Sequence, residues 1–238
     1  MINKKIAIMQ PYIFPYLGYF QLINSVDEFV FYDDVNFIKK GWINRNNILL
    51  NNQKFMFTIP CIKISQNKLI NEVKTIENQQ GLEKILKMIK NGYYHAPNFD
   101  IVYPMIEQRI MMPNTNISDM AVGSVNDVLN YLDVNKDVYC SSKLAYNRNN
   151  DAQGKIISIC NCLNANEYIN MIGGHGLYNN SDFLMQNISL KFLKPTLSTY
   201  KQFTNDFISG LSIIDVLMFN SKSDILNMCN NFELIDSI

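Results

Sequence analysis

The chain has 238 residues, a length that single α/β domains commonly reach, and 47% of them are hydrophobic, which is enough for a large core. Its 21 Lys and Arg residues balance 21 Asp and Glu residues, so the formal net charge is zero. This balance excludes binding to nucleic acid or an anionic membrane through a broad basic field, and an anionic ligand would need a local group of cations.

The start of the chain has lysines and then a short apolar run, in the order of a signal peptide, but Gln10, prolines and tyrosines interrupt the apolar part. No stretch approaches the roughly 18 apolar residues of a membrane span, so we predict no membrane insertion and a cytoplasmic location. The five cysteines contain no C-x-x-C pair and the chain has only two histidines. They predict free thiols rather than disulfides or a metal site.

The first predicted element is a buried strand at residues 6–9, which ends before a Gln-Pro pair. Apolar residues at helical spacing follow at 19–26, and residues 28–32 have the composition of a second strand. Strand, helix and strand in about thirty residues form a βαβ unit, so we predict that the two strands are parallel.

The next stretch, residues 35–50, is dense in Asn, Lys and Arg, and we predict a polar loop there rather than core. A strand stopped by Pro60 follows. The later predicted elements are helices near 81–90 and within 93–112, a helix at 118–132 with Ser118 as N-cap, a strand at 138–140, a helix at 151–164, strands at 167–170 and 188–192, and a helix at 213–219. This alternation predicts one α/β domain, a three-layer sandwich with a mostly parallel sheet, a Rossmann-like start and additional helices in the C-terminal half.

Four passages resemble the signatures of a known family: QPYIFPYLGYFQLI at 10–23, FVFYDDVNFIKKGWINRN at 29–46, GGHGLY at 173–178 and LSIIDVLMFN at 211–220. They resemble the WbqC-like proteins in order and span most of the chain. The resemblance implies an enzyme of bacterial surface-polysaccharide biosynthesis, such as that of lipopolysaccharide O-antigen, because members generally lie beside such genes. It implies no settled reaction.

The first βα unit is also similar, more distantly, to that of the HIGH-type nucleotidyltransferases, which have the HUP fold. In those enzymes two histidines of the loop before the helix bind phosphate, and the matching positions here hold Tyr16 and Tyr19. Tyrosine can donate a hydrogen bond to phosphate but supplies no cation. The resemblance therefore implies a HUP-like start of the fold, while the missing histidines disfavour adenylyl transfer.

Candidate ligand-binding residues follow the first two strands, because open α/β sheets bind ligands beyond the carboxyl ends of their strands. The first group consists of side chains that combine an apolar part with a polar end, which suits the binding of a sugar or nucleotide: Gln10, Tyr12, Tyr16 and Tyr19. For the tyrosines, packing of the helix on the sheet is the alternative. A second group combines cationic side chains that could bind phosphate, amide side chains that could bind sugar hydroxyls, and the only tryptophan of the chain. Its members are Lys39, Trp42, Asn44, Arg45 and Asn46. A solvated loop is the alternative there.

Three further candidates concern chemistry at the ends of strands. Asp33 could act as a base or cap a turn, and His175 could act as a base or simply face solvent. Gly173 and Gly174, before Tyr178, could let a ligand approach the backbone or could form an ordinary tight turn.

We therefore hypothesise a transferase that moves an acyl group from a coenzyme A or carrier-protein thioester to the amine of a nucleotide-linked amino-deoxy sugar. His175 or Asp33 would remove the amine proton. Arg45 and Lys39 would hold phosphate, and backbone N–H groups near Gly173 would stabilise the oxyanion. A nucleotidyl or adenylate-forming enzyme and a non-catalytic sugar-nucleotide-binding partner stay open as alternatives, as does homo-oligomer formation.

Overall fold

The computed structural model describes residues 3–76, 79–113 and 115–237. Within these residues the main sheet has six strands, and every neighbouring pair is parallel except β7 and β8. In spatial order the strands are β5 (Asp137–Cys140), β2 (Glu28–Phe31), β1 (Lys5–Met9), β6 (Glu167–Met171), β7 (Ser189–Pro195) and β8 (Phe232–Asp236). The predicted parallel pairing of the first two strands is confirmed, with Ala7 opposite Phe29.

The order of the parallel strands explains where a ligand would bind. Numbered along the chain, these strands lie in the order 3-2-1-4-5, which is that of doubly wound, Rossmann-like sheets. The chain adds β2 and β5 on one side of β1 and then returns to add β6 and β7 on the other. The topological switch point therefore lies between β1 and β6.

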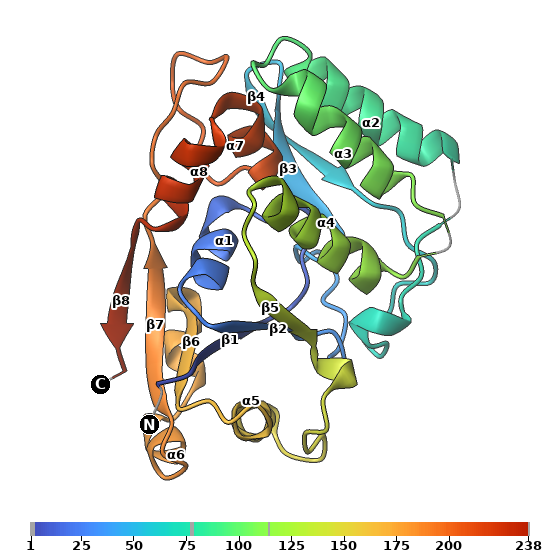
Figure 1. Cartoon of the computed structure of the whole chain (residues 1–238). Helices are drawn as coiled ribbons and strands as arrows, with labels where there is room; N and C mark the ends of the chain where they lie inside the picture. The colour runs from blue at the N-terminus through green and yellow to red at the C-terminus, as the bar shows by residue number, and fades with distance from the viewer. Residues whose placement is uncertain (1–2, 77–78, 114, 238) are drawn as a thin grey trace.

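Helices cover both faces of this sheet, which confirms the predicted three-layer α/β fold (Figure 1). One face carries Ala7 and Ile169 and packs in the same apolar cluster as α1 (Leu17–Asn24), α4 (Ile117–Tyr131), α7 (Ile213–Phe219) and α8 (Lys222–Cys229). The other face carries Ile8 and Tyr168 and packs against α5 (Ala152–Cys162) and α6 (Asn180–Leu184). No helix in the described part of the chain is both long enough and apolar enough for a membrane crossing.

A separate antiparallel hairpin consists of β3 (Arg45–Leu50) and β4 (Gln53–Thr58), packed against α2 (Gln79–Tyr93) and α3 (Phe99–Ile110). Its turn residues Asn51 and Asn52 have left-handed φ values of 51° and 60°, as a two-residue hairpin turn requires. One apolar cluster runs from the sheet face under α1 to the residues under α2, so the hairpin shares the core of the sheet. The prediction of a single domain remains a prediction.

Two predicted features are wrong. Residues 45–50 are not part of a polar loop but a largely buried strand, in which the Asn46 amide binds the backbone carbonyls of Ile13 and Phe14. Ser118 is not an N-cap, since α4 begins after Asn116, whose side-chain oxygen accepts a hydrogen bond from the Asp119 N–H. The prediction also lacked α6, α8 and β8, which are short, and the connecting 3-10 turns η1 (Ile70–Glu72), η2 (Ser141–Lys143) and η3 (Ile172–Leu177).

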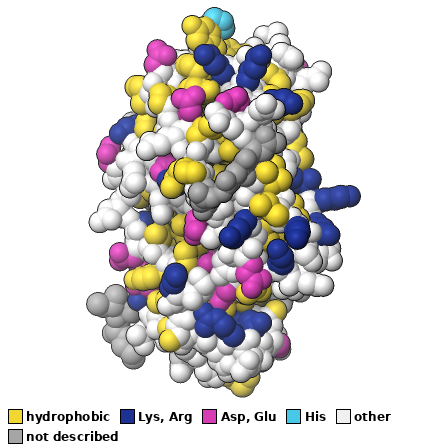
Figure 2. All heavy atoms as spheres, turned by 90° about the vertical axis from the view of Figure 1, so that its right-hand side faces the viewer, with side chains coloured by type: hydrophobic (Ala, Val, Ile, Leu, Met, Phe, Trp, Pro, Cys, Tyr) yellow, Lys and Arg dark blue, Asp and Glu magenta, His cyan; other side chains and the backbone are white. Residues whose placement is uncertain are grey.

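The molecular surface carries no single field of charge on the face shown in Figure 2, where Lys and Arg side chains lie among acidic and hydrophobic ones. This mixture is what a balanced composition predicts.

Candidate functional site

The carboxyl ends of the parallel strands form the edge of the sheet where open α/β folds bind ligands. Gln10 follows β1 and Gly173 follows β6, so both residues lie at the switch point between these strands. A β-carbon built on Gly173 would meet no atom within 4 Å. The space beside the Gly173 backbone is therefore open to a ligand.

The loop after β1 leads to a cavity of about 340 Å³, which we call the aromatic pocket. It is lined by Tyr12, Pro15, Tyr16, Trp42, Asn46 and Gly210. Four residues predicted from two separate passages thus meet in one place. None of the described lining residues is charged, so the pocket suits an uncharged ring or chain rather than a phosphate.

Backbone and amide contacts hold the walls of the aromatic pocket together. The Asn46 side-chain N–H groups donate to the carbonyl oxygens of Ile13 and Phe14, at 3.1 and 2.7 Å. The Ser212 hydroxyl donates to the same Phe14 oxygen at 2.7 Å, and Ser212 forms a backbone bridge with Tyr16. Three segments that are far apart in sequence are therefore joined at the loop after β1.

Gly18 determines where the Tyr16 ring lies. A β-carbon at position 18 would lie 2.5 to 2.6 Å from the outer atoms of that ring, closer than real contacts allow. Those atoms are the far end of a rotatable side chain, so a larger residue at position 18 would displace the ring and leave the helix backbone in place.

The predicted cation and amide group is only partly available to a ligand. Arg45 donates from Nε to the Gly41 carbonyl at 2.8 Å and from Nη2 to the Lys40 carbonyl, and its guanidinium carbon lies 5.9 Å from the centre of the Trp42 ring. The Asn44 amide donates to the Ile59 carbonyl at 2.9 Å. These side chains shape the loop that carries Trp42. Lys39 is exposed, and within the described residues no hydrogen bond or ion pair involves its ammonium group.

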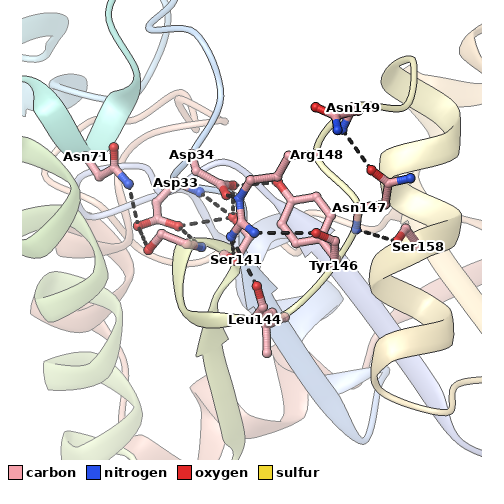
Figure 3. A network of polar contacts seen from close by, with 11 residues as sticks. Asp33, Asp34, Asn71, Ser141, Leu144, Tyr146, Asn147, Arg148, Asn149 and Ser158 are labelled. Carbon is pink, nitrogen blue, oxygen red and sulfur yellow. Dashed lines mark hydrogen bonds and ion pairs between the residues drawn. The ribbon is translucent and has the colours of Figure 1, made fainter.

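Asp33 lies at the centre of a polar network that joins the ends of β2 and β5 (Figure 3). Its carboxylate accepts hydrogen bonds from the Ser142 N–H and hydroxyl at 2.9 and 2.7 Å, the Ser141 hydroxyl at 3.1 Å, and the Asn71 amide at 3.5 Å. The residue is 4% exposed. Both carboxylate oxygens are thus engaged, which favours the capping role over that of a base.

Asp34 forms the second half of this network. Its carboxylate accepts from the Arg148 Nε at 2.8 Å and from the Tyr146 hydroxyl at 2.9 Å, and it shares the single proton of the Ser141 hydroxyl with the Asp33 carboxylate. Arg148 also donates to the Ser141 and Leu144 carbonyls and lies 4.3 Å above the Tyr146 ring. Reasoning from the sequence missed Arg148, Tyr146 and Ser141. The sequence does indicate that β5 is a strand, so these residues could be placed after its end. Only the order of the strands in the sheet, however, shows that this end lies beside Asp34.

Three tyrosine side chains, Tyr32, Tyr146 and Tyr178, lie along the edge of the sheet between Asp34 and Asn170. Burial and the nearby Asp34 carboxylate raise the pKa of Tyr32 to about 12. Burial and the hydrogen bond to Asp34 raise the pKa of Tyr146 as well. Burial also raises the pKa of Tyr178, whose hydroxyl accepts from the Asn170 amide at 3.1 Å. At neutral pH these phenols are protonated and can donate hydrogen bonds.

The two glycines before His175 have different surroundings. Gly174 is buried, and a β-carbon there would lie 2.7 Å from the Asn170 amide nitrogen, so glycine permits the contact between Asn170 and Tyr178. His175 is exposed, its ring centre lies 4.8 Å from that of Phe192, and in the described residues no hydrogen bond involves its imidazole.

Tyr19 and the two candidate bases, His175 and Asp33, do not line the aromatic pocket. Tyr19 is 1% exposed and donates from its hydroxyl to the Gln10 carbonyl at 3.0 Å, so it packs α1 on the sheet and fixes the end of β1. His175 lies over β7 and Asp33 follows β2, three strands away, which corresponds to roughly 14 Å across the sheet. The two candidate bases are therefore alternatives and not a pair.

The comparison with known proteins covers nearly all of this arrangement. Residues 10–226 match the model of the WbqC-like protein family. The chain belongs to this family. It is also similar to a Mycobacterium tuberculosis protein named "Uncharacterized protein Rv1507c", with 28% identity over 236 residues that cover 95% of this chain and 99% of the relative. No solved structure matches the chain.

The part of the chain that matches the WbqC-like model includes the aromatic pocket, the network around Asp33 and Asp34, and a buried carboxyl group at Asp215. The Asp215 carboxylate accepts from the Tyr93 hydroxyl at 2.9 Å and from the Tyr200 hydroxyl and Gln202 amide at 2.6 Å each. Burial raises its pKa, although these hydrogen bonds act in the opposite direction.

Asp215 has a positioning role in this WbqC-like chain. It joins α7 to α2 through Tyr93 and to the loop at 196–212 through Tyr200 and Gln202. The same loop supplies Gly210 to the aromatic pocket. The start of the loop is held by Gln21, whose amide donates to the Thr196 carbonyl at 2.9 Å. The loop that closes one side of the pocket is thus fixed at several points.

Proposed function

We propose that this WbqC-like protein is a transferase of bacterial surface-polysaccharide biosynthesis that adds an acyl group to the amine of a nucleotide-linked amino-deoxy sugar. The observation that supports this proposal is the aromatic pocket, where Tyr12 and Tyr16 meet Trp42 and Asn46 near the carboxyl edge of the sheet. Aromatic ring faces and an amide suit a sugar ring, and the uncharged lining suits an acyl group. The free ammonium group of Lys39 is the proposed contact to the diphosphate.

The proposed reaction transfers the acyl group from a thioester of coenzyme A or of a carrier protein. The sugar amine attacks the thioester carbonyl, a C–N bond forms, the C–S bond breaks, and the thiolate leaves. The amine proton passes through a base to the leaving thiolate, which becomes a thiol. We assign the base to His175 rather than Asp33, because in the described residues no hydrogen bond involves the exposed imidazole, whereas Ser142 and Asn71 donate to both oxygens of the Asp33 carboxylate. His175 does not line the aromatic pocket, so this assignment requires the sugar amine to extend from the pocket to the edge of the sheet at His175.

Trp42 supplies a direct test of the proposed ligand, because it is the only tryptophan of the chain and lines the aromatic pocket. Titration with uridine and thymidine diphosphate sugars, with and without a free amine, should change its fluorescence saturably. Lys39→Ala should weaken this binding about tenfold if Lys39 contacts phosphate, whereas Lys87→Ala, at an exposed position of α2, should leave it unchanged.

The reaction is tested by mass spectrometry after incubation of the protein with an amino-sugar nucleotide and acetyl-coenzyme A. The product should be the sugar nucleotide with an added acetyl group, together with free coenzyme A. If no diphosphate sugar changes the Trp42 fluorescence, the proposed substrate class is wrong.

Gly18→Ala is expected to weaken binding of the same nucleotide sugars about tenfold, because the new methyl group displaces the Tyr16 ring from the aromatic pocket. Stability should change by less than about 1 kcal/mol, since alanine favours a helix and only a rotatable ring has to move. Fluorescence titration and urea unfolding measure the two effects. In a Tyr16→Ala background, Gly18→Ala should cause no further loss. A full additional loss would show that the displaced ring is not the cause.

A nucleotidyl or adenylate-forming reaction is the second candidate, and the strand order 3-2-1-4-5 is the observation that favours it. Of the two positions that hold histidines in the HIGH-type enzymes, Tyr19 is buried and only Tyr16 lines the pocket. Release of pyrophosphate from ATP and Mg²⁺ in the presence of the sugar would support this candidate and contradict acyl transfer. Saturable binding without any product would support a non-catalytic binding partner.

A further inference from the structure

We infer that the protein has a second binding site, for a neutral saccharide, in a cavity of about 460 Å³ between the β3–β4 turn, the end of α2 and the loop at 196–212. Figure 1 shows where these three segments lie in the fold. We call it the amide cavity. Its lining includes Asn51, Asn52, Asn91, Tyr94, His95 and Phe203. The inference does not depend on the proposed acyl transfer, because it rests on other residues.

The three asparagine side chains of the amide cavity are free to bind a ligand. Asn51, Asn52 and Asn91 are exposed, and within the described residues no hydrogen bond involves their side-chain amides. Each amide can donate two hydrogen bonds and accept others, which matches the hydroxyl groups of a sugar. This property points to a polyhydroxylated ligand.

Another amide-lined cavity, of about 480 Å³ between α5 and α6, lacks this property. There the Gln153 amide donates to the Asp182 carboxylate at 2.6 Å, and the Asn150 amide donates to the Gly154 carbonyl at 3.2 Å. Those amides stabilise the protein itself, so a saccharide would have to displace existing hydrogen bonds.

Two aromatic rings of the amide cavity are partly exposed and held by neighbouring rings, and the Lys90 ammonium group lies over the Tyr94 ring, 5.9 Å from its centre. Tyr94 is 57% exposed and Phe203 is 45% exposed. Tyr94 packs against Phe99 with 5.4 Å between ring centres, and Phe203 packs against Phe219 at 4.8 Å. A partly exposed ring that is held from behind offers a flat apolar surface to the C–H face of a pyranose ring, at little cost in conformational entropy.

The charge and the rigidity of the amide cavity favour a neutral ligand. None of the described lining residues is Asp, Glu, Lys or Arg, and the nearby Lys90 ammonium group faces the Tyr94 ring at 5.9 Å, so the lining itself supplies no cation for a phosphate. The walls are fixed, because a β-carbon at Gly92 would lie 2.4 Å from the Leu49 carbonyl oxygen and α2 thus packs directly on the hairpin. The volume lies within the roughly 300–1,000 Å³ of small-molecule sites.

The inference is tested by saturation-transfer difference NMR with methyl glycosides of glucose, galactose, mannose and N-acetylglucosamine and with maltose, followed by calorimetry of the best ligand. We expect transfer to the ring C–H protons of at least one of them. Tyr94→Ala, Asn91→Ala and Phe203→Ala should each weaken this binding about tenfold. Phe55→Ala is the matched control for Phe203→Ala, because Phe55 is 44% exposed and lies on β4 outside the cavity lining.

Asn91 is exposed on a helix, so its replacement by alanine keeps the fold, and the melting temperature of each variant verifies this. Absence of transfer to every one of these sugars would overturn the inference, and so would transfer that both Tyr94→Ala and Asn91→Ala leave unchanged. Loss of transfer on addition of uridine diphosphate, together with a saturable change of Trp42 fluorescence by the same sugar, would place the saccharide in the aromatic pocket instead. Failure of acyl transfer would leave these results unaffected.

Discussion

Asp215→Ala should lower the free energy of unfolding by about 3 kcal/mol, because it leaves the donors of Tyr93, Tyr200 and Gln202 without their acceptor in the core. Asp215 is 0% exposed, and no other acceptor is placed to replace its oxygens among the hydrogen bonds of the described residues. The same change releases the loop at 196–212, so ligand binding at the aromatic pocket should weaken as well. Urea unfolding followed by circular dichroism measures the first effect.

Asp236→Ala is the control, because the Asp236 side chain is 85% exposed and its contact to Lys191 spans 3.8 Å. This variant should stay within about 0.5 kcal/mol of the wild type. A loss of less than about 1 kcal/mol for Asp215→Ala would mean that the buried hydrogen bonds contribute little.

The pH dependence of stability provides an independent check on Asp215. Burial raises the pKa of this carboxyl group in the folded protein above its ordinary value of 3.8. The folded state therefore holds the proton more tightly than the unfolded state, and the contribution of this group to stability is fully present below the ordinary pKa. It is lost as the pH rises through the raised pKa. The difference in stability between wild type and Asp215→Asn should accordingly shift against the wild type as the pH rises through this window, in urea unfolding at matched pH values.

His175→Ala should lower kcat of the proposed acyl transfer by about 100-fold or more, with little change in KM, because a positioned base contributes about 10²–10⁴-fold. The imidazole is exposed, has no hydrogen-bond partner among the described residues and packs against the Phe192 ring, so its removal should change the free energy of unfolding by less than about 1 kcal/mol. Steady-state kinetics with an amino-sugar nucleotide and acetyl-coenzyme A measure the effect.

Leu177→Ala is the matched control, since Leu177 lies in the same 3-10 turn and is 73% exposed. This variant should retain the wild-type kcat. If His175→Ala retains kcat and Asp33→Asn loses it without a loss of stability, the base is Asp33 and the assignment to His175 is wrong.

Much of the local structure could be predicted, because buried apolar residues recur along the chain at the spacing of a helix or a strand. The strand predicted at 6–9 is β1 at Lys5–Met9, and the helix predicted at 151–164 is α5 at Ala152–Cys162. Each has an apolar pattern set by neighbouring residues, which the sequence displays directly. The family could be predicted for a similar reason, since its four passages are continuous segments that all lie within the matched residues 10–226.

The strand β3 could not be predicted, because the side chain of its buried Asn46 bonds to distant groups. Asn46 binds the carbonyls of Ile13 and Phe14, and Asn44, directly before the strand, binds that of Ile59. A run of asparagines indicates a loop when each amide is assumed to bind water. The hydrogen bonds that make these amides tolerable in the core appear only in the folded chain.

The sequence by itself determined the α/β alternation, the parallel start of the sheet and membership of the WbqC-like family. Only the tertiary structure decided which predicted residues line the same pocket and which are buried and stabilise the fold. Strand order placed Arg148 and Ser141 beside Asp34, and packing of α7 placed Asp215 against Tyr93, 122 residues away. The physical reason is that hydrophobic periodicity is a property of neighbouring residues, whereas the partner of a buried polar group is fixed by which elements pack together.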